Sequence, residues 1–157
     1  MIATASSEEK LELARSLGAD ILIDYAEEDW PEKVREATEG KGADVILEMV
    51  GADFPEKNLT CLNVFGRMVV FGAASRERGT IIPAALMKRC HAVVGFYLPQ
   101  IMRRPDLFVP SLEEVLGWIS SGKLKLTIGS TYPLAQAAEA HAALEGRKTT
   151  GKLILNP

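Results

Sequence analysis

Short apolar runs alternate with amphipathic stretches along the first two thirds of the chain. Aliphatic, often β-branched composition, with polar residues or glycine after most of the runs, predicts five strands: 2–5, 21–23, 45–47, 68–71 and 92–97. Apolar positions at helical spacing predict helices after each of the first four strands. This repeated strand–helix order predicts an α/β fold, with a parallel sheet covered by helices and right-handed crossovers. The uninterrupted apolar run at 45–47 predicts a strand buried on both faces.

Helix boundary signals support this order of elements. Ser6 and Glu9 have the spacing of a capping box, and Gly18 would end the helix that Ser6 begins. Asp29 can cap the next helix, with Pro31 in its first turn. The third and fourth helices are expected at 54–62 and 84–88.

The pattern changes after residue 98. Ser111 and Glu114 have the spacing of another capping box, which predicts the start of an amphipathic helix. A strand is expected at 124–128, then a helix that ends near Gly146, and a last short strand at 151–156. Since no internal repeat, low-complexity tract or flexible linker occurs, residues 1–157 are predicted to form one domain.

Composition excludes several classes of protein. With 47% hydrophobic and 25% charged residues, the chain has an ordinary globular composition. No apolar run reaches the roughly 18 residues of a membrane-spanning helix, and the first residues lack the pattern of a signal peptide. Cys61 and Cys90 do not make a disulfide framework, so a cytoplasmic location is expected.

Charge is divided unevenly along the chain. The net charge of −3 argues weakly against nucleic acid as a partner. Residues 1–60 hold 15 acids and 6 bases, whereas residues 61–157 hold 6 acids and 12 bases. Half of the later bases are Arg76, Arg78, Lys88, Arg89, Arg103 and Arg104. They are interpreted either as solvated loops and helix ends or as a basic wall near an anionic ligand.

The carboxyl ends of the predicted strands are where an open α/β sheet binds its ligands. A dinucleotide-binding fold that prefers NAD usually has an acid at the tip of its second strand. Here Ser6 and Ser7 follow the strand at 2–5, and Lys10 lies one turn into the helix. Hydroxyls, a helix N-terminus and an ammonium group suit a ribose 2′-phosphate instead. Gly51 and Gly72 either let a ligand approach the backbone or merely end their strands.

Other chemistries find little support in the sequence. The Cys90–His91 pair has no further Cys or His nearby in sequence to complete a metal site. Neither a nucleophile elbow nor a Walker phosphate loop occurs. We therefore assign no catalytic residue and no metal ligand.

Several strings of the sequence occur together, and in this order, in one known family: residues 3–10 (ATASSEEK), 17–20 (LGAD), 23–25 (IDY), 42–51 (GADVILEMVG), 66–72 (GRMVVFG), 132–141 (YPLAQAAEAH) and 151–155 (GKLIL). The chain resembles the zinc-independent quinone oxidoreductase branch of the medium-chain dehydrogenase/reductase superfamily over nearly all of its length. Glu48 departs from the pattern, because the family usually has aspartate there.

The resemblance implies an NADPH-dependent reductase of quinones or similar α,β-unsaturated carbonyls, without a metal. It implies that Ser6, Ser7, Lys10 and Tyr25 lie near the adenosine 2′-phosphate and that Val50 and Gly51 lie beside the adenosine. The residues implied near the nicotinamide half are Phe71, Gly72, Ser75, Phe96 and Leu98. Arg147 matches an arginine that can approach the cofactor.

One part of the family pattern is not found. The glycine fingerprint of the first strand–helix unit does not occur, since the nearest string, residues 40–42 (GKG), follows a helix. The expected fold is therefore a Rossmann-like, doubly wound parallel sheet that lacks its first βα unit, with a gap in the order 3-2-1-4-5-6. Repacking of the sheet, a strand from a neighbouring molecule, or the strand at 152–155 could fill the gap. Residues 123–157 match the segment that returns to the family's separate catalytic domain.

The sequence is compatible with three hypotheses of function. The first is the cofactor-binding portion of an NADPH-dependent oxidoreductase that is catalytically incomplete as it stands. The second is a binding or dimerisation module, with a homodimer formed through the strand edge at 92–97, which matches the edge that the family pairs. The third keeps the enzyme but makes it an enoyl reductase or an alcohol dehydrogenase.

Overall fold

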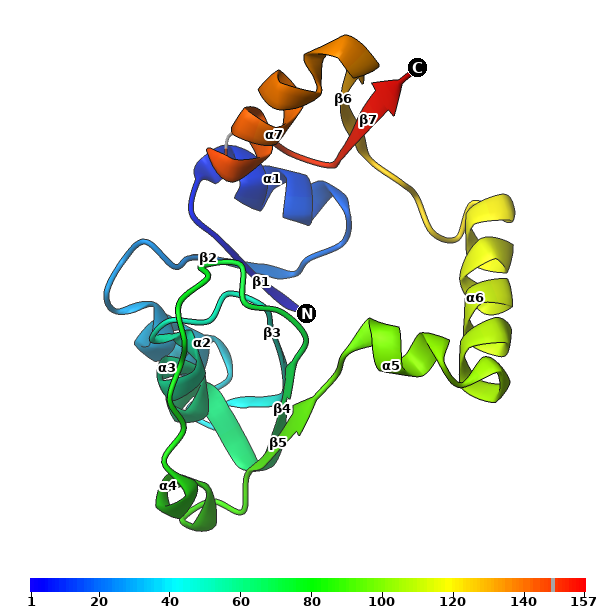
Figure 1. Cartoon of the computed structure of the whole chain (residues 1–157). Coiled ribbons are helices and arrows are strands. Elements are labelled where there is room, and N and C mark those ends of the chain that lie inside the picture. Colours follow the sequence, from blue (N-terminus) through cyan, green and yellow to red (C-terminus); the bar gives the residue numbers. More distant parts are fainter. Residues whose placement is uncertain (148) are drawn as a thin grey trace. The chain divides into compact units, whose positions relative to one another are not determined.

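The computed structural model describes residues 1–147 and 149–157 of the chain, which form two compact units, Met1–Leu98 and Pro99–Pro157. The first unit follows the predicted strand–helix alternation (Figure 1). Its elements are β1 (Ile2–Ala5), α1 (Glu8–Ser16), β2 (Ile21–Asp24), α2 (Trp30–Ala37), β3 (Ala43–Glu48), α3 (Phe54–Cys61), β4 (Leu62–Val70), α4 (Pro83–Met87) and β5 (Ala92–Gly95).

All strand pairs of the first unit are parallel, as predicted, but they form two sheets. β1 pairs with β2, and β3, β4 and β5 form a second sheet in that order. Among the described residues, no ladder of hydrogen bonds joins β1 to β3. This division lies where the sequence predicts a gap, because β2, β1, β3, β4 and β5 correspond to positions 3, 2, 4, 5 and 6 of the doubly wound order.

The core of the first unit includes two buried clusters formed by strands and by α2 and α3, and Leu11 of α1 is buried as well. One buried cluster joins Ile23 of β2 to Trp30 and Val34 of α2 and to Cys61 of α3. A second cluster joins Leu59, Leu62 and Met68. Trp30 and Val34 have the i, i+4 spacing that predicted the inward face of their helix.

The prediction that both faces of the 45–47 strand are buried is wrong for this chain. Ile46 packs against both buried clusters, whereas Val45 and Leu47 remain 58% and 69% exposed. Side chains alternate along a strand, so these two residues share the face opposite Ile46. No described residue buries that second face.

The helix boundaries correct one predicted cap and confirm others. Ser7, not Ser6, is the N-cap of α1, and its hydroxyl makes no capping hydrogen bond. Its backbone carbonyl accepts from the N–H groups of Lys10 and Leu11 at 3.1 Å each. Gly18, with φ +102°, follows this helix in the left-handed conformation that was predicted. Asp29 is the N-cap residue of α2 with Pro31 in the first turn, as predicted, but its carboxylate makes no capping hydrogen bond.

The second unit contains α6 (Pro105–Ser120), β6 (Ile128–Pro133), a short 3-10 turn (Leu134–Gln136), α7 (Ala137–Glu145) and β7 (Lys152–Asn156). A short helix, α5 (Leu98–Met102), spans the boundary between the units. β6 and β7 pair in parallel with each other. How the gap between β1 and β3 is filled stays a prediction.

Two boundaries of the second unit differ from the prediction. Ser111 lies inside α6 rather than at its start, and its hydroxyl donates to the carbonyl oxygen of Leu107 at 2.9 Å. The helix begins earlier because Pro105 suits its first turn and Arg104 precedes it as the N-cap. The strand predicted at 124–128 begins only at Ile128. None of the helices in the part of the chain that the structure describes is long and apolar enough to cross a bilayer.

Candidate cofactor-binding site

The first group of predicted site residues lies at the carboxyl ends of β1 and β2. The ladder pairs Ala5 with Asp24, so the residues that follow these strands are neighbours. The N–H of Tyr25 continues this pairing by donating to the carbonyl oxygen of Ala5 at 3.0 Å. Ser6 and Ser7 follow β1, and Lys10 lies in the first turn of α1. The structure thus brings all four residues predicted at the 2′-phosphate to one edge, called here the first edge.

Asp24, the carboxylate at the end of β2, is engaged in its own turn. Its Oδ1 accepts the backbone N–H of Ala26 at 2.8 Å. Such a local bond is a common way for an aspartate to stabilise a turn. This bond engages one oxygen of the Asp24 carboxylate, whereas Glu8 and Glu9 place two exposed carboxylates in the first turn of α1, between Ser7 and Lys10.

Aromatic packing supports the first edge. The ring of Tyr25 meets that of Phe54 edge to face, with centroids 5.2 Å apart. Phe54 in turn stacks on Trp30 at 5.6 Å and 20°. Because Phe54 is the first residue of α3, it connects the end of β2 with the loop that precedes α3.

The second group lies at the carboxyl ends of β3 and β4 and is organised around Glu48, the last residue of β3. The residue is 3% exposed. One carboxylate oxygen, Oε1, accepts the backbone N–H groups of Val50 at 2.6 Å and Gly51 at 2.8 Å. The other, Oε2, accepts from the side-chain amide of Asn58 in α3. The loop that follows β3 is therefore folded around a buried carboxylate.

Backbone hydrogen bonds join the loop after β3 to the loop after β4. The carbonyl oxygens of Met49 and Val50 accept from the N–H groups of Ala74 and Ser75, at 2.8 Å each. The N–H of Ala52 donates to the carbonyl oxygen of Glu77 at 3.2 Å. Four of the predicted residues, Val50, Gly51, Gly72 and Ser75, lie within this double loop, and Phe71 leads into it. Residues 49–52 and 71–77 are called here the second edge.

The packing of the second-edge loops leaves little space for a side chain at either of its two glycines. Gly51 has φ +83°, and a Cβ there would lie 2.8 Å from the carbonyl oxygen of Glu77 and 3.0 Å from the hydroxyl of Ser75. A Cβ on Gly72 would lie 3.2 Å from the Cβ and the carbonyl oxygen of Met49. Both glycines thus permit close approach of a neighbouring loop. The sequence had suggested instead that they admit a ligand or merely end their strands.

The start of α3 fixes the far end of the first of these loops. Asp53 is the N-cap of the helix, with Pro55 in its first turn. The Asp53 carboxylate contacts the ammonium group of Lys57 at 2.7 Å. The hydrogen bond from Lys57 holds the pKa of Asp53 below its ordinary value.

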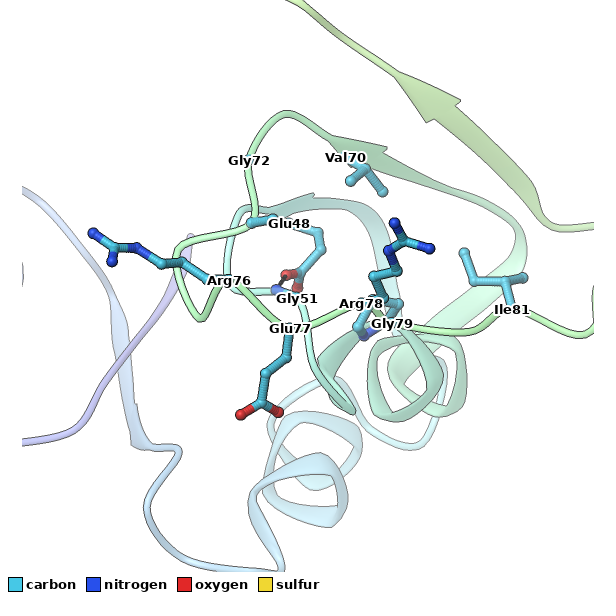
Figure 2. Close-up of a pocket in the computed structure, with 11 residues that line it drawn as sticks. Glu48, Gly51, Val70, Gly72, Arg76, Glu77, Arg78, Gly79 and Ile81 are labelled. Atoms are coloured by element: carbon cyan, nitrogen blue, oxygen red, sulfur yellow. Dashed lines mark hydrogen bonds between the residues drawn. The ribbon is translucent and has the colours of Figure 1, made fainter.

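A pocket of about 360 Å³ opens beside the double loop. Figure 2 shows the side chain of Glu48 turned toward Gly51, with Arg78 extended between Val70 and Ile81. Of the basic residues singled out in the sequence, Arg76 and Arg78 belong to this pocket lining. Arg89 and Arg104 make contacts elsewhere, since Arg89 donates to the carbonyl oxygen of Lys41 and Arg104 pairs with Asp106.

The remaining predicted residues lie at the end of β5 and in the second unit. The N–H of Phe96 donates to the carbonyl oxygen of Val70 at 2.8 Å, which places it beside the end of β4. Leu98 begins α5 and is exposed. Arg147 follows α7 in the second unit with φ +55°. Because Arg147 belongs to the second unit, its approach to the cofactor stays a prediction.

The Cys90–His91 pair has no further candidate ligands beside it in the described part of the chain, although both ring nitrogens of His91 are buried without a hydrogen-bond partner. Cys90 is exposed, and burial lowers the pKa of His91. Within the described residues, no three His, Cys, Asp or Glu side chains gather closely enough to hold a metal ion.

Comparison with known proteins identifies the family of the chain. Residues 17–155 match the family described as zinc-binding dehydrogenase. The chain belongs to this family. It represents the C-terminal, nucleotide-binding part of medium-chain dehydrogenases/reductases and is similar to quinone oxidoreductases, as its sequence indicates.

Individual relatives agree with this assignment. A quinone oxidoreductase of Pseudomonas aeruginosa is 35% identical over the whole chain, which covers 49% of that protein. A 2-haloacrylate reductase of Burkholderia is 34% identical, with 100% of this chain and 48% of the relative covered. The crystal structure of Escherichia coli quinone oxidoreductase complexed with NADPH matches 99% of this chain with a TM-score of 0.90 at 32% identity, and 49% of its own chain is covered. The chain thus spans about half the length of these relatives, and the predicted Rossmann-type α/β fold is confirmed.

Two residues that organise the site were not predicted to do so. In the sequence, Glu48 stands out only because the family usually has aspartate there, and Phe54 only begins the predicted third helix. An acid at a strand end, two and three residues before the backbone N–H groups of a turn, is the signal that could have identified Glu48. The contacts of Phe54 with Tyr25 and Trp30 had no comparable signal, because they join residues far apart in the sequence.

Proposed function

We propose that the chain is the cofactor-binding portion of an NADPH-dependent oxidoreductase that transfers hydride to a quinone or another α,β-unsaturated carbonyl. The observation that carries the proposal is the first edge, where Ser6, Ser7, Lys10 and Tyr25 follow two adjacent strand ends while one oxygen of the Asp24 carboxylate is bound in its own turn. Hydroxyl and ammonium groups at a helix N-terminus favour a phosphate on the ribose. The likeness to a quinone oxidoreductase complexed with NADPH supports the same assignment.

In this proposal each edge has its own task. The first edge binds the 2′-phosphate, and the second edge holds the adenosine against Val50 and Gly51 and guides the nicotinamide half past Phe71, Gly72 and Ser75. Phe96, Leu98 and Arg147 are proposed to complete the cofactor site. The bound cofactor supplies the hydride, and the protein contributes mainly placement of donor and acceptor.

The acceptor is proposed by chemical class only. The name of the haloacrylate reductase among the relatives describes reduction of an unsaturated acid, which supports an activated carbon–carbon double bond as the alternative to a quinone. A dimer through the β5 edge stays a proposal. It draws support from β5 pairing, among the described strands, with β4 alone.

Calorimetric titration of the chain with NADPH and, separately, with NADH tests the proposal. We expect preferential binding of NADPH, with a Kd weaker than micromolar because the glycine fingerprint does not occur. Lys10→Ala should weaken NADPH binding about tenfold and leave NADH binding unchanged, since a charged contact to the 2′-phosphate is lost.

Lys41→Ala is the matched control, because Lys41 is an exposed lysine that pairs with Glu39 away from the first edge. Equal affinity for the two cofactors, or equal weakening of both by Lys10→Ala, would contradict the proposed specificity. A folded chain that binds neither cofactor would favour the binding or dimerisation module.

A further inference from the structure

Glu48 is a buried carboxylate held by neutral donors. In the described part of the chain, the groups that reach it are the N–H groups of Val50 and Gly51 and the side-chain amide of Asn58, which is itself 5% exposed. Burying a carboxylate is unfavourable unless hydrogen bonds satisfy it well. Such a group is expected where a particular backbone geometry has to be maintained.

The backbone that Glu48 holds is the first half of the second edge. The N–H group of Val50 donates to Glu48, and the carbonyl oxygen of Val50 accepts the backbone N–H of Ser75. The carbonyl of Met49, between Glu48 and Val50, accepts from Ala74. The bonds of Glu48 therefore extend through the loop after β3 to the loop after β4.

We infer that Glu48 is a positioning residue for the cofactor, an inference that rests on the proposed function. It contacts no cofactor atom in this proposal. It fixes the N–H groups of Val50 and Gly51, and thereby the conformation in which this loop forms the wall for the adenosine and supports Ser75. Preorganising these loops reduces the ordering cost of binding, so the residue acts on NADPH affinity through the backbone.

The length of the side chain explains the role of Asn58. An aspartate at a strand end can accept N–H groups two and three residues further on, so it would suffice for Val50 and Gly51. The additional methylene of Glu48 lets Oε2 reach Asn58 in α3 as well. The loop is thereby attached to the helix that follows it.

The test compares NADPH affinity among variants of the full chain. Glu48→Ala removes the acceptor of two buried N–H groups and should weaken NADPH binding about tenfold. Glu48→Asp should restore affinity to within about threefold of the unaltered chain, because the backbone acceptors return. Glu56→Ala is the matched control, since Glu56 is an exposed glutamate on the same helix, α3.

A second comparison separates positioning from general stability. Leu59→Ala removes a side chain from the second buried cluster and should lower the unfolding temperature without changing NADPH affinity. Hydrogen exchange of the Val50 and Gly51 amides should accelerate in Glu48→Ala and not in Leu59→Ala. If Glu48→Ala does not fold, Glu48→Gln tests the same point, with an expected loss of about threefold because one oxygen acceptor remains.

The outcomes distinguish this inference from the function on which it rests. If the unaltered chain binds NADPH and the folded Glu48 variant binds it equally well, the positioning role is wrong and the proposed function stands. If Leu59→Ala weakens binding as much as Glu48→Ala does, general destabilisation accounts for the effect and the role is again wrong. Absence of NADPH binding by the unaltered chain would overturn the proposed function and this role together.

Discussion

The two edges of the first unit present their predicted residues by different physical means. At the first edge the candidate groups are side chains on a helix start and a strand end: the hydroxyls of Ser6 and Ser7, the ammonium of Lys10 and the ring of Tyr25. At the second edge the candidates are mostly backbone, joined by hydrogen bonds between two loops around a buried carboxylate. The first edge is thus suited to choosing between ligands, and the second to providing a fixed shape.

This difference predicts which substitutions change stability and which change only binding. A side chain exposed at the first edge can be removed at little cost to the fold. A change at the second edge disturbs backbone bonds that are shared by two loops. Phe54 touches both regions, because it begins α3 after the loop of Glu48 and contacts Tyr25 and Trp30.

Phe54→Ala is expected to have the largest effect, because it removes the ring that packs the start of α3 against Tyr25 and Trp30. Loss of its contacts with Tyr25 and Trp30 should lower the free energy of unfolding by about 2–4 kcal/mol. The measurement is denaturant unfolding of the variant and of Phe54→Leu, which keeps apolar volume and should cost less.

Labelling of Cys61 provides an independent readout of the same change. Burial raises the pKa of the Cys61 thiol to about 11, so little thiolate exists at pH 8 and labelling should be much slower than at exposed Cys90. We expect Phe54→Ala to accelerate labelling of Cys61 and leave the rate at Cys90 unchanged. Unchanged stability and labelling would show that the edges do not depend on this ring.

Gly51→Ala should have the next largest effect. The added Cβ would lie within 3.0 Å of two atoms of the facing loop, at a φ of +83° that side chains rarely adopt. We expect a loss of about 1–3 kcal/mol in unfolding free energy, together with weaker NADPH binding.

Two control glycines separate the causes of this loss. Gly18 also has a positive φ but open space around its Cβ position, and Gly95 has open space and no positive φ. Gly18→Ala should therefore show the conformational cost alone, and Gly95→Ala neither cost. If Gly51→Ala is no more destabilising than Gly18→Ala, the close approach of the two loops does not constrain this position.

The sequence predicted the order and type of elements in the first unit because hydrophobic periodicity depends on local spacing. The spacing of Trp30 and Val34 identified an inward helix face, and parallel pairing followed from the short strand–helix connections. It also predicted that residues after β1 and β2 would meet, since the ends of adjacent parallel strands share an edge. Their binding of a cofactor stays a prediction.

The structural predictions that were wrong or missing concern features that the local sequence does not determine uniquely. Ser6 and Ser7 can both cap a helix, and only the end of β1 decides between them. The apolar face of Val45 and Leu47 indicates a sheet covered on both sides, but no described residue of this chain covers it. Glu48 and Asn58 could not be paired from sequence, because their contact depends on how α3 returns toward β3.

Ser7→Ala should have the smallest effect on stability and a selective effect on binding. An N-cap serine usually contributes about 1 kcal/mol through its side chain, but the Ser7 hydroxyl makes no capping hydrogen bond. We therefore expect a change of less than about 0.5 kcal/mol in unfolding free energy and a loss of about threefold in NADPH affinity, with NADH affinity unchanged. Ser16→Ala is the control, since the Ser16 hydroxyl donates to the carbonyl oxygen of Leu13 at the other end of the same helix. A stability loss near that of an ordinary cap would mean that Ser7 serves the helix rather than a ligand. The division between a first edge that selects and a second edge that shapes would then no longer hold at this residue.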